Sequence, residues 1–192
     1  MAASRSPTVD TLAVFVVVFA LQTAASLVGL SGALSLFVLS PPVTDAPGTI
    51  LTSVYAHGSL GHLLANSVAL VLAGFVVERR TTWLRFHLFF LTVGAVAGVS
   101  QVVLSGLFGT PTGVLGASGA VFGLFGYLLT GNRVTTTVFS RIQLSPRAQI
   151  VVFVVAAAVV TVATGQPGVA LVAHFVGLLL GLLAGPTRLL DA

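Results

Sequence analysis

The sequence predicts an all-α polytopic membrane protein, a bundle of six transmembrane helices. Of the 192 residues, 56% are hydrophobic and 6% are charged, and the mean hydropathy is +1.11. Soluble globular domains carry about 25% charged residues, so this composition cannot cover a surface that faces water. Apolar stretches of about 20 residues, long enough to cross a hydrocarbon layer of roughly 30 Å, recur along the chain. We therefore expect a single transmembrane domain over residues 1–192.

Six apolar runs are separated by polar segments or by segments rich in Pro and Gly. The first run is longer than one crossing needs, and we expect it to tilt or to break near Gly29. Polar loops are expected at residues 40–54 and 131–147. The predicted spans are residues 11–39, 60–77, 83–107, 114–130, 148–164 and 168–185.

The charged residues predict the orientation. The chain has arginines and no lysine, and the arginines are scattered between apolar runs, which disfavours a nucleic-acid partner despite the net charge of +4. Six spans place every arginine on one side, and the positive-inside tendency makes that side cytoplasmic, with both termini. A cleaved signal peptide is the alternative for the first run, which is long for a signal core. Cysteine is absent, so no disulfide framework or thiolate metal site is expected.

Four polar side chains stand out inside the predicted spans, where such groups are costly and usually functional. They are His62 and Asn66 in the second span, Ser118 in the fourth and His174 in the sixth. These three spans run inward from the outer side. At 1.5 Å per residue, the four side chains are expected roughly 5–10 Å below the outer ends of their helices. Three helices would thus bring polar groups to a common depth.

These residue types fit a serine hydrolase. A serine hydroxyl becomes a good nucleophile when a neighbouring base takes its proton, and neutral His174 suits that task for Ser118. No Asp or Glu lies inside a predicted span, which favours a Ser–His dyad over a triad. His62 and Asn66 are four residues apart on one helical face and could donate to an oxyanion, together with the backbone N–H of Ser118.

Small residues would let the fourth and sixth spans approach closely, as a contact between Ser118 and His174 requires. Gly116 and Gly119 flank the serine, and further glycines continue along both spans. These are Gly123 and Gly126 in the fourth span, and Gly177, Gly181 and Gly185 in the sixth.

Four motifs, in order, resemble the rhomboid family of intramembrane proteases in its compact six-helix form. The resemblance covers about residues 50–185. The motifs are Gly116-Ala117-Ser118-Gly119, His57-x4-His62-x3-Asn66, Glu78-Arg79-Arg80 and Ala173-His174-x2-Gly177-x3-Gly181.

The resemblance implies a serine endopeptidase that cleaves transmembrane protein substrates near their outer membrane end, without cofactor or metal. It implies Ser118 as nucleophile, His174 as base, and His62 and Asn66 in the oxyanion hole, with His57 in a supporting role. Phe122 stands where some members carry Tyr and is expected to pack against His174. The first loop lacks the Trp-Arg pair of many relatives. A prokaryotic plasma membrane is the expected location, and membrane lipid the expected surroundings.

Two other functions fit the composition. A catalytically silent rhomboid-like protein would bind membrane clients, but such relatives typically lack the serine or the histidine, and this chain has both. A small transporter or channel would be expected to show internal repeats or intramembrane carboxylates. No H-E-x-x-H motif for zinc is present. The substrate, its cleavage motif, the oligomeric state and the element that admits substrate are not predicted.

Overall fold

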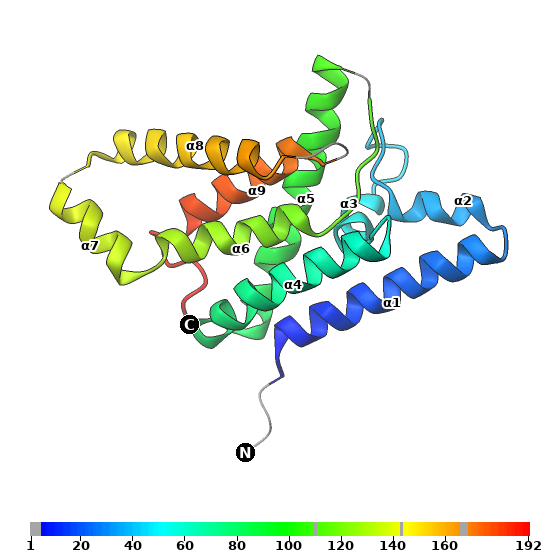
Figure 1. The fold of residues 1–192 in the computed structure, drawn as a ribbon, viewed down its shortest axis with the longest axis horizontal. Helices are drawn as coiled ribbons and strands as arrows, with labels where there is room; N and C mark the ends of the chain where they lie inside the picture. The colour runs from blue at the N-terminus through cyan, green and yellow to red at the C-terminus, as the bar shows by residue number, and fades with distance from the viewer. Residues whose placement is uncertain (1–4, 110, 143, 166–168) are drawn as a thin grey trace.

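The computed structural model describes residues 5–109, 111–142, 144–165 and 169–192, which are helical apart from turns, loops and one isolated β-bridge between Leu39 and Val114 (Figure 1). Short 3-10 turns follow α2, α3 and α4. The helices are α1 (Pro7–Leu27), α2 (Ser31–Leu34), α3 (Thr49–Thr52), α4 (Leu60–Val77), α5 (Trp83–Phe108), α6 (Ser118–Thr130), α7 (Arg133–Ile142), α8 (Pro146–Ala163) and α9 (Leu171–Ala184).

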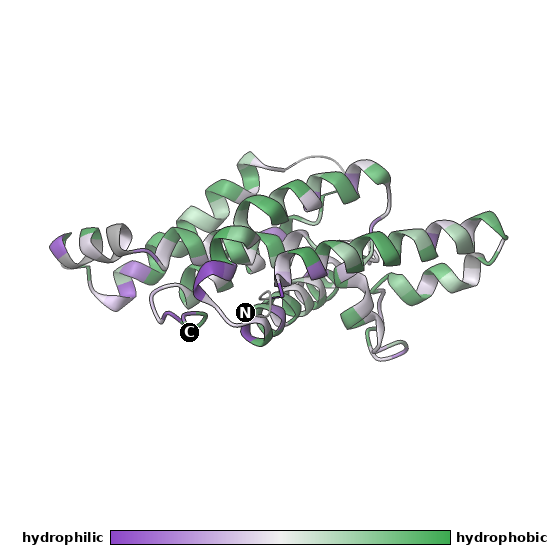
Figure 2. Cartoon of the chain, turned by 90° about the horizontal axis from the view of Figure 1, so that it is seen from below, coloured by the Kyte–Doolittle hydropathy of each residue, from purple (hydrophilic) through white to green (hydrophobic). Residues whose placement is uncertain are grey.

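The six predicted spans correspond to α1, α4, α5, α6, α8 and α9, and the chain is a multi-pass membrane protein. Helices α1, α4, α5 and α8 are long and apolar enough to cross a bilayer, whereas α6 and α9 are shorter apolar helices. Figure 2 shows hydrophobic residues along most of the helical length and hydrophilic stretches close to the marked chain ends. The 13 residues of α6 span only about 20 Å, and the chain just before α6 pairs with Leu39 and Ser53 and leads into the buried Ala117. Irregular backbone is tolerated at such depth where protein buries it.

One end of the bundle, which we name the arginine face, carries Arg5, Arg80 and Arg85. Hydrogen bonds join distant segments there. The Glu78 carboxylate accepts from Ser6 Oγ at 2.7 Å and thereby links the end of α4 to the start of α1. The final residues of the chain also dock here, since the N–H of Ala192 donates to the carbonyl of Arg80 at 2.8 Å. These contacts join the N-terminal segment, the α4–α5 connection and the C-terminal segment, all of which carry arginines. The three segments therefore lie on one side of the bundle, the side predicted to be cytoplasmic.

Helices α6 and α9 form the closest pair of the bundle and lie beside α4 and α5. Their backbones touch where glycines face each other. A Cβ on Gly177 would overlap the carbonyl group of Gly119, and a Cβ on Gly181 would overlap that of Gly123. The predicted close approach of these two helices is confirmed. Helix α8 packs mainly against α9, and Figure 1 shows it with α7 at the periphery.

The structure differs from the predicted boundaries at several places. The break expected near Gly29 is present: α1 ends at Leu27 and not near residue 39, because the chain turns at Gly29, whose φ is +73°. The predicted loop 131–147 contains α7, an amphipathic helix whose apolar residues are too few to mark a span. The helices of the fourth and sixth spans, α6 and α9, start later than predicted, at Ser118 and Leu171. The predicted start of the sixth span, residue 168, lies outside the described residues.

Candidate active site

Ser118 is the first residue of α6, about one helical turn closer to the helix end than the sequence predicts. The chain reaches it in a non-helical conformation, held by a hydrogen bond from the N–H of Gly116 to the carbonyl of Ser53 at 2.9 Å. Gly116 has a φ of +129°, a conformation that L side chains rarely adopt. A Cβ at this position would lie 2.7 Å from Cε1 of His62. Both the backbone conformation and the lack of space therefore require glycine at position 116. The His62 ring lies against the backbone just before Ser118.

His174 is the fourth residue of α9 and is buried. The Phe122 ring stacks on its imidazole with ring centroids 4.3 Å apart and an interplanar angle of 29°, so the predicted contact is present. Phe122 lies four residues after Ser118 and thus on the same face of α6. This face of α6 is directed at His174.

Neighbours of the serine and the histidine touch directly. A Cβ on Gly119 would lie 3.4 Å from the carbonyl oxygen of Ala173. Ser118 and His174 therefore sit next to a backbone contact between their helices. No hydrogen bond joins them in the described part of the chain, where Nδ1 of His174 is buried without a hydrogen-bond partner. The structure places the two residues on facing, closely packed helices, and among the described residues no hydrogen bond joins the hydroxyl to the imidazole.

The predicted oxyanion donors lie on α4, which packs against α6. His62 is half-buried, and its ring lies against Gly116. Asn66 is buried, and its Nδ2 donates to the carbonyl oxygen of His62 at 3.1 Å. One of its two amide hydrogens is thus used within α4, and the other remains for a different acceptor.

The start of α6 adds backbone donors. The first N–H groups of any helix have no acceptor within the helix, and they carry the positive end of the helix dipole. Ala117 precedes Ser118 and provides no side-chain cap. The first hydrogen bond back into this turn comes from the N–H of Val121. Uncapped N–H groups at Ser118 and Gly119 are therefore directed toward the same region as the serine hydroxyl.

His57 lies just before α4 and is almost completely buried. Its backbone N–H donates to Oε1 of Gln22 at 3.1 Å, and its ring makes edge contacts with Phe15 and His62, at centroid distances of 4.8 and 5.1 Å. Burial, together with the neighbouring His62, lowers the pKa of His57 to about 4, so this imidazole is neutral at pH 7. His57 contacts His62 directly, and no hydrogen bond joins it to Ser118 among the described residues, which fits the supporting position that the resemblance implies.

Gln101 of α5 also contacts the candidate site, although it is not among the residues predicted from the sequence. Its Oε1 accepts from the N–H groups of Val172 at 3.0 Å and Ala173 at 3.2 Å, in the first turn of α9. Helix α9 has no side-chain cap from its own N-cap residue, so Gln101 fixes the helix end that carries His174. The rule that found Asn66, a polar amide inside a span, applies equally to Gln101 and would have found it.

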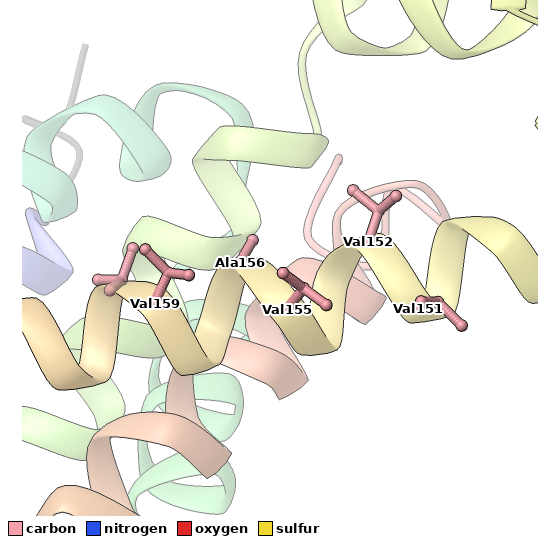
Figure 3. Close-up of a pocket in the computed structure, with 6 residues that line it drawn as sticks. Val151, Val152, Val155, Ala156 and Val159 are labelled. Atoms are coloured by element: carbon pink, nitrogen blue, oxygen red, sulfur yellow. The ribbon is translucent and has the colours of Figure 1, made fainter.

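A shallow apolar groove of about 480 Å³ lies on the outward side of α8 and is separate from this cluster. Figure 3 shows its lining, which consists of valines and Ala156. None of the candidate site residues contributes to it. The groove offers apolar contact and no polar chemistry.

Together these features describe a multi-pass helical membrane protein with a serine, three histidines and an asparagine gathered near one end of the bundle. The chain belongs to the rhomboid family, because the family model described as "Rhomboid domain" matches residues 46–190. The matched region contains every candidate site residue named above.

The chain is similar to named rhomboid proteins. It is 33% identical over 144 residues to "RHOMBOID-like protein 4" of Arabidopsis thaliana, an alignment that covers 73% of this chain and 34% of that protein. It is 38% identical over 80 residues to "Rhomboid protease GluP" of Bacillus subtilis (strain 168), covering 42% of this chain and 15% of that protein. The chain thus spans about a third or less of the length of these relatives. Protease function is characteristic of the family that they share.

Proposed function

We propose that this chain is an intramembrane serine endopeptidase, in which Ser118 attacks the scissile peptide carbonyl of a transmembrane protein substrate and His174 accepts the hydroxyl proton. The contact of Gly119 with Ala173 and Gly177 carries the proposal, because it holds the serine and histidine on facing helices. The stacked Phe122 limits rotation of the His174 ring. Both features favour a proton transfer from Ser118 Oγ to the imidazole.

The reaction follows the acyl-transfer scheme. Attack by Ser118 Oγ forms a C–O bond and a tetrahedral oxyanion, for which the N–H groups at the start of α6, the His62 ring and the free amide hydrogen of Asn66 are the available donors. Collapse breaks the peptide C–N bond, and His174 returns the proton to the leaving amine. Water then hydrolyses the acyl-enzyme, with His174 again accepting and returning a proton. No cofactor or metal enters any of these steps.

One observation favours the alternative, a catalytically silent rhomboid-like protein that binds membrane clients. The Ser118 hydroxyl and His174 share no hydrogen bond among the described residues. Catalytic hydrogen bonds are, however, often long in free enzymes and tighten when substrate binds. Retention of both residues on glycine-packed helices favours the enzyme.

Cleavage of a single-span model substrate in proteoliposomes tests the proposal. Wild type is expected to release two fragments, and Ser118→Ala to reduce the rate by roughly 10⁴-fold or more. Ser105→Ala is the matched control, because Ser105 also lies in a span but donates to its own helix, to the carbonyl of Val102. Binding of the substrate without cleavage by wild type would favour the silent client-binding protein instead.

A further inference from the structure

Helices α1 and α5 enclose a groove of about 590 Å³ that has a polar end and an apolar length. We name it the α1–α5 groove. Arg5, Asp10, Trp83 and His87 lie at the end near the arginine face, and residues such as Val17 and Leu88 line the remainder. Many of the apolar lining residues are exposed; Val17 is 57% and Leu88 is 56% accessible. The groove is therefore open to the hydrocarbon of one leaflet.

The polar end is an organised network. The Nε of Arg5 lies 2.6 Å from Oδ2 of Asp10, and the same oxygen accepts from Trp83 Nε1 at 2.7 Å. The Arg5 guanidinium lies over the Trp83 ring, 5.2 Å from its centroid, and the Trp83 and His87 rings meet edge to face. These contacts hold the positive group of Arg5 and the negative group of Asp10 side by side at the polar end of the α1–α5 groove.

Unused hydrogen-bonding capacity remains in this network. The Arg5 side chain is 72% exposed and pairs with Asp10 through its Nε, so its guanidinium, which carries five N–H donors, has terminal nitrogens that can bind a phosphate. Oδ2 of Asp10 accepts from both partners, which leaves Oδ1 as an acceptor for an ammonium group. The charges of the pair cancel, so the site matches a ligand that carries both signs.

The length of the groove matches one leaflet. Seven residues separate Asp10 from Val17 and eight separate Trp83 from Leu91, which correspond to about 10 and 12 Å along the two helices. Half of the hydrocarbon layer is about 15 Å thick. An acyl chain whose headgroup lies at Arg5 and Asp10 would run along most of the groove and end near Tyr55.

We propose that the α1–α5 groove binds one glycerophospholipid from the leaflet at the arginine face, and that it prefers a headgroup with a phosphate and a primary ammonium. The phosphate binds Arg5, the ammonium binds Asp10, and one acyl chain lies between α1 and α5. Phosphatidylethanolamine has both groups. The quaternary ammonium of phosphatidylcholine cannot donate a hydrogen bond to Asp10, and the Trp83 face that would attract it already holds Arg5. Phosphatidylglycerol offers no cation to Asp10.

Native mass spectrometry of the full chain in detergent tests this site, with the three phospholipids added separately and with identical acyl chains. Wild type is expected to retain one phosphatidylethanolamine with an apparent affinity about tenfold above that for the other two lipids, the effect of one additional charge-assisted hydrogen bond. Arg5→Gln and Asp10→Asn are each expected to reduce this preference to less than twofold. Arg147→Gln, which removes an arginine at the start of α8, is the charge-matched control and should keep it.

A second pair of variants separates the groove from general lipid contact. Leu88→Trp places a large ring in the groove and is expected to lower retention of phosphatidylethanolamine about tenfold, whereas Leu64→Trp on the exposed side of α4 should leave it unchanged. Leu88 and Leu64 are both more than half exposed, so neither substitution fills a core position. Equal retention of the three lipids by wild type, or an unchanged preference in Arg5→Gln and Leu88→Trp, would show annular lipid only and would overturn the proposal.

Discussion

The contact between α6 and α9 predicts a large effect from a single methyl group at Gly177. A Cβ there would overlap the carbonyl oxygen of Gly119 and lie 2.8 Å from its carbonyl carbon. Ordinary contact begins near 3.4 Å, so the helices must separate by at least about 0.6 Å. Both groups that collide are backbone, so a side-chain rotation cannot relieve the overlap. Gly177→Ala therefore moves His174 away from Ser118.

The expected magnitudes follow from this displacement. Overpacking of this kind typically costs about 1–3 kcal/mol of stability. A misplacement of about 1 Å lowers catalytic rates about 100-fold, so a shift of at least about 0.6 Å should lower kcat/KM by roughly 10-fold or more. The assay measures substrate cleavage per folded protein, with the folded fraction determined by circular dichroism, beside thermal unfolding in the same detergent.

Gly106→Ala provides the matched control. Gly106 also lies in a span, in α5, but a Cβ there would meet nothing within 4 Å. This control should cleave like wild type and unfold at the same or a slightly higher temperature, since alanine favours the helix over glycine. If Gly177→Ala cleaved within twofold of wild type, the close α6–α9 contact would not be what holds the serine and the histidine together.

Substitutions at three further residues test individual contacts. Gln101→Met removes the acceptor for the first turn of α9 and should lower the cleavage rate about tenfold, whereas Gln101→Glu, which keeps an acceptor oxygen, should restore most of it; equal rates for both variants would contradict the anchoring role. Phe122→Ala removes a ring stacked on His174, an interaction of about 0.5–1.5 kcal/mol, and should lower kcat/KM by roughly 3- to 10-fold, while Phe122→Tyr should retain wild-type activity. Tyr127→Phe removes the hydrogen bond to Asp191 at the arginine face and should lower the free energy of unfolding by about 1–3 kcal/mol with little change in the cleavage rate per folded protein; a large loss of rate would contradict the separation of this contact from the site.

The sequence predicted the candidate site through residue types at helical spacing. Polar side chains in apolar runs identified His62, Asn66, Ser118 and His174, and glycines four residues apart predicted which helices approach each other. These signals are local, and they do not depend on how the loops fold. The structure places the four residues on the expected helices, and their catalytic roles stay a prediction.

Other features depend on contacts between distant segments and could not be predicted. Residues 114–117 are as apolar as a span, yet they are not helical, because Val114 pairs with Leu39 and Gly116 bonds to Ser53. The start of α6 at Ser118 follows from those bonds. The hydrogen bond from Asn66 to the His62 carbonyl also depends on side-chain rotation, which spacing alone does not set.

Covalent labelling with a fluorophosphonate tests the central claim, that His174 activates Ser118, most directly. Intact-mass and peptide analysis of the detergent-solubilised chain should show one label, on Ser118, with a rate that falls at least about 100-fold in His174→Ala and is unchanged in the matched His87→Ala variant. Labelling of His174→Ala at the wild-type rate, or a label on another serine, would contradict the account.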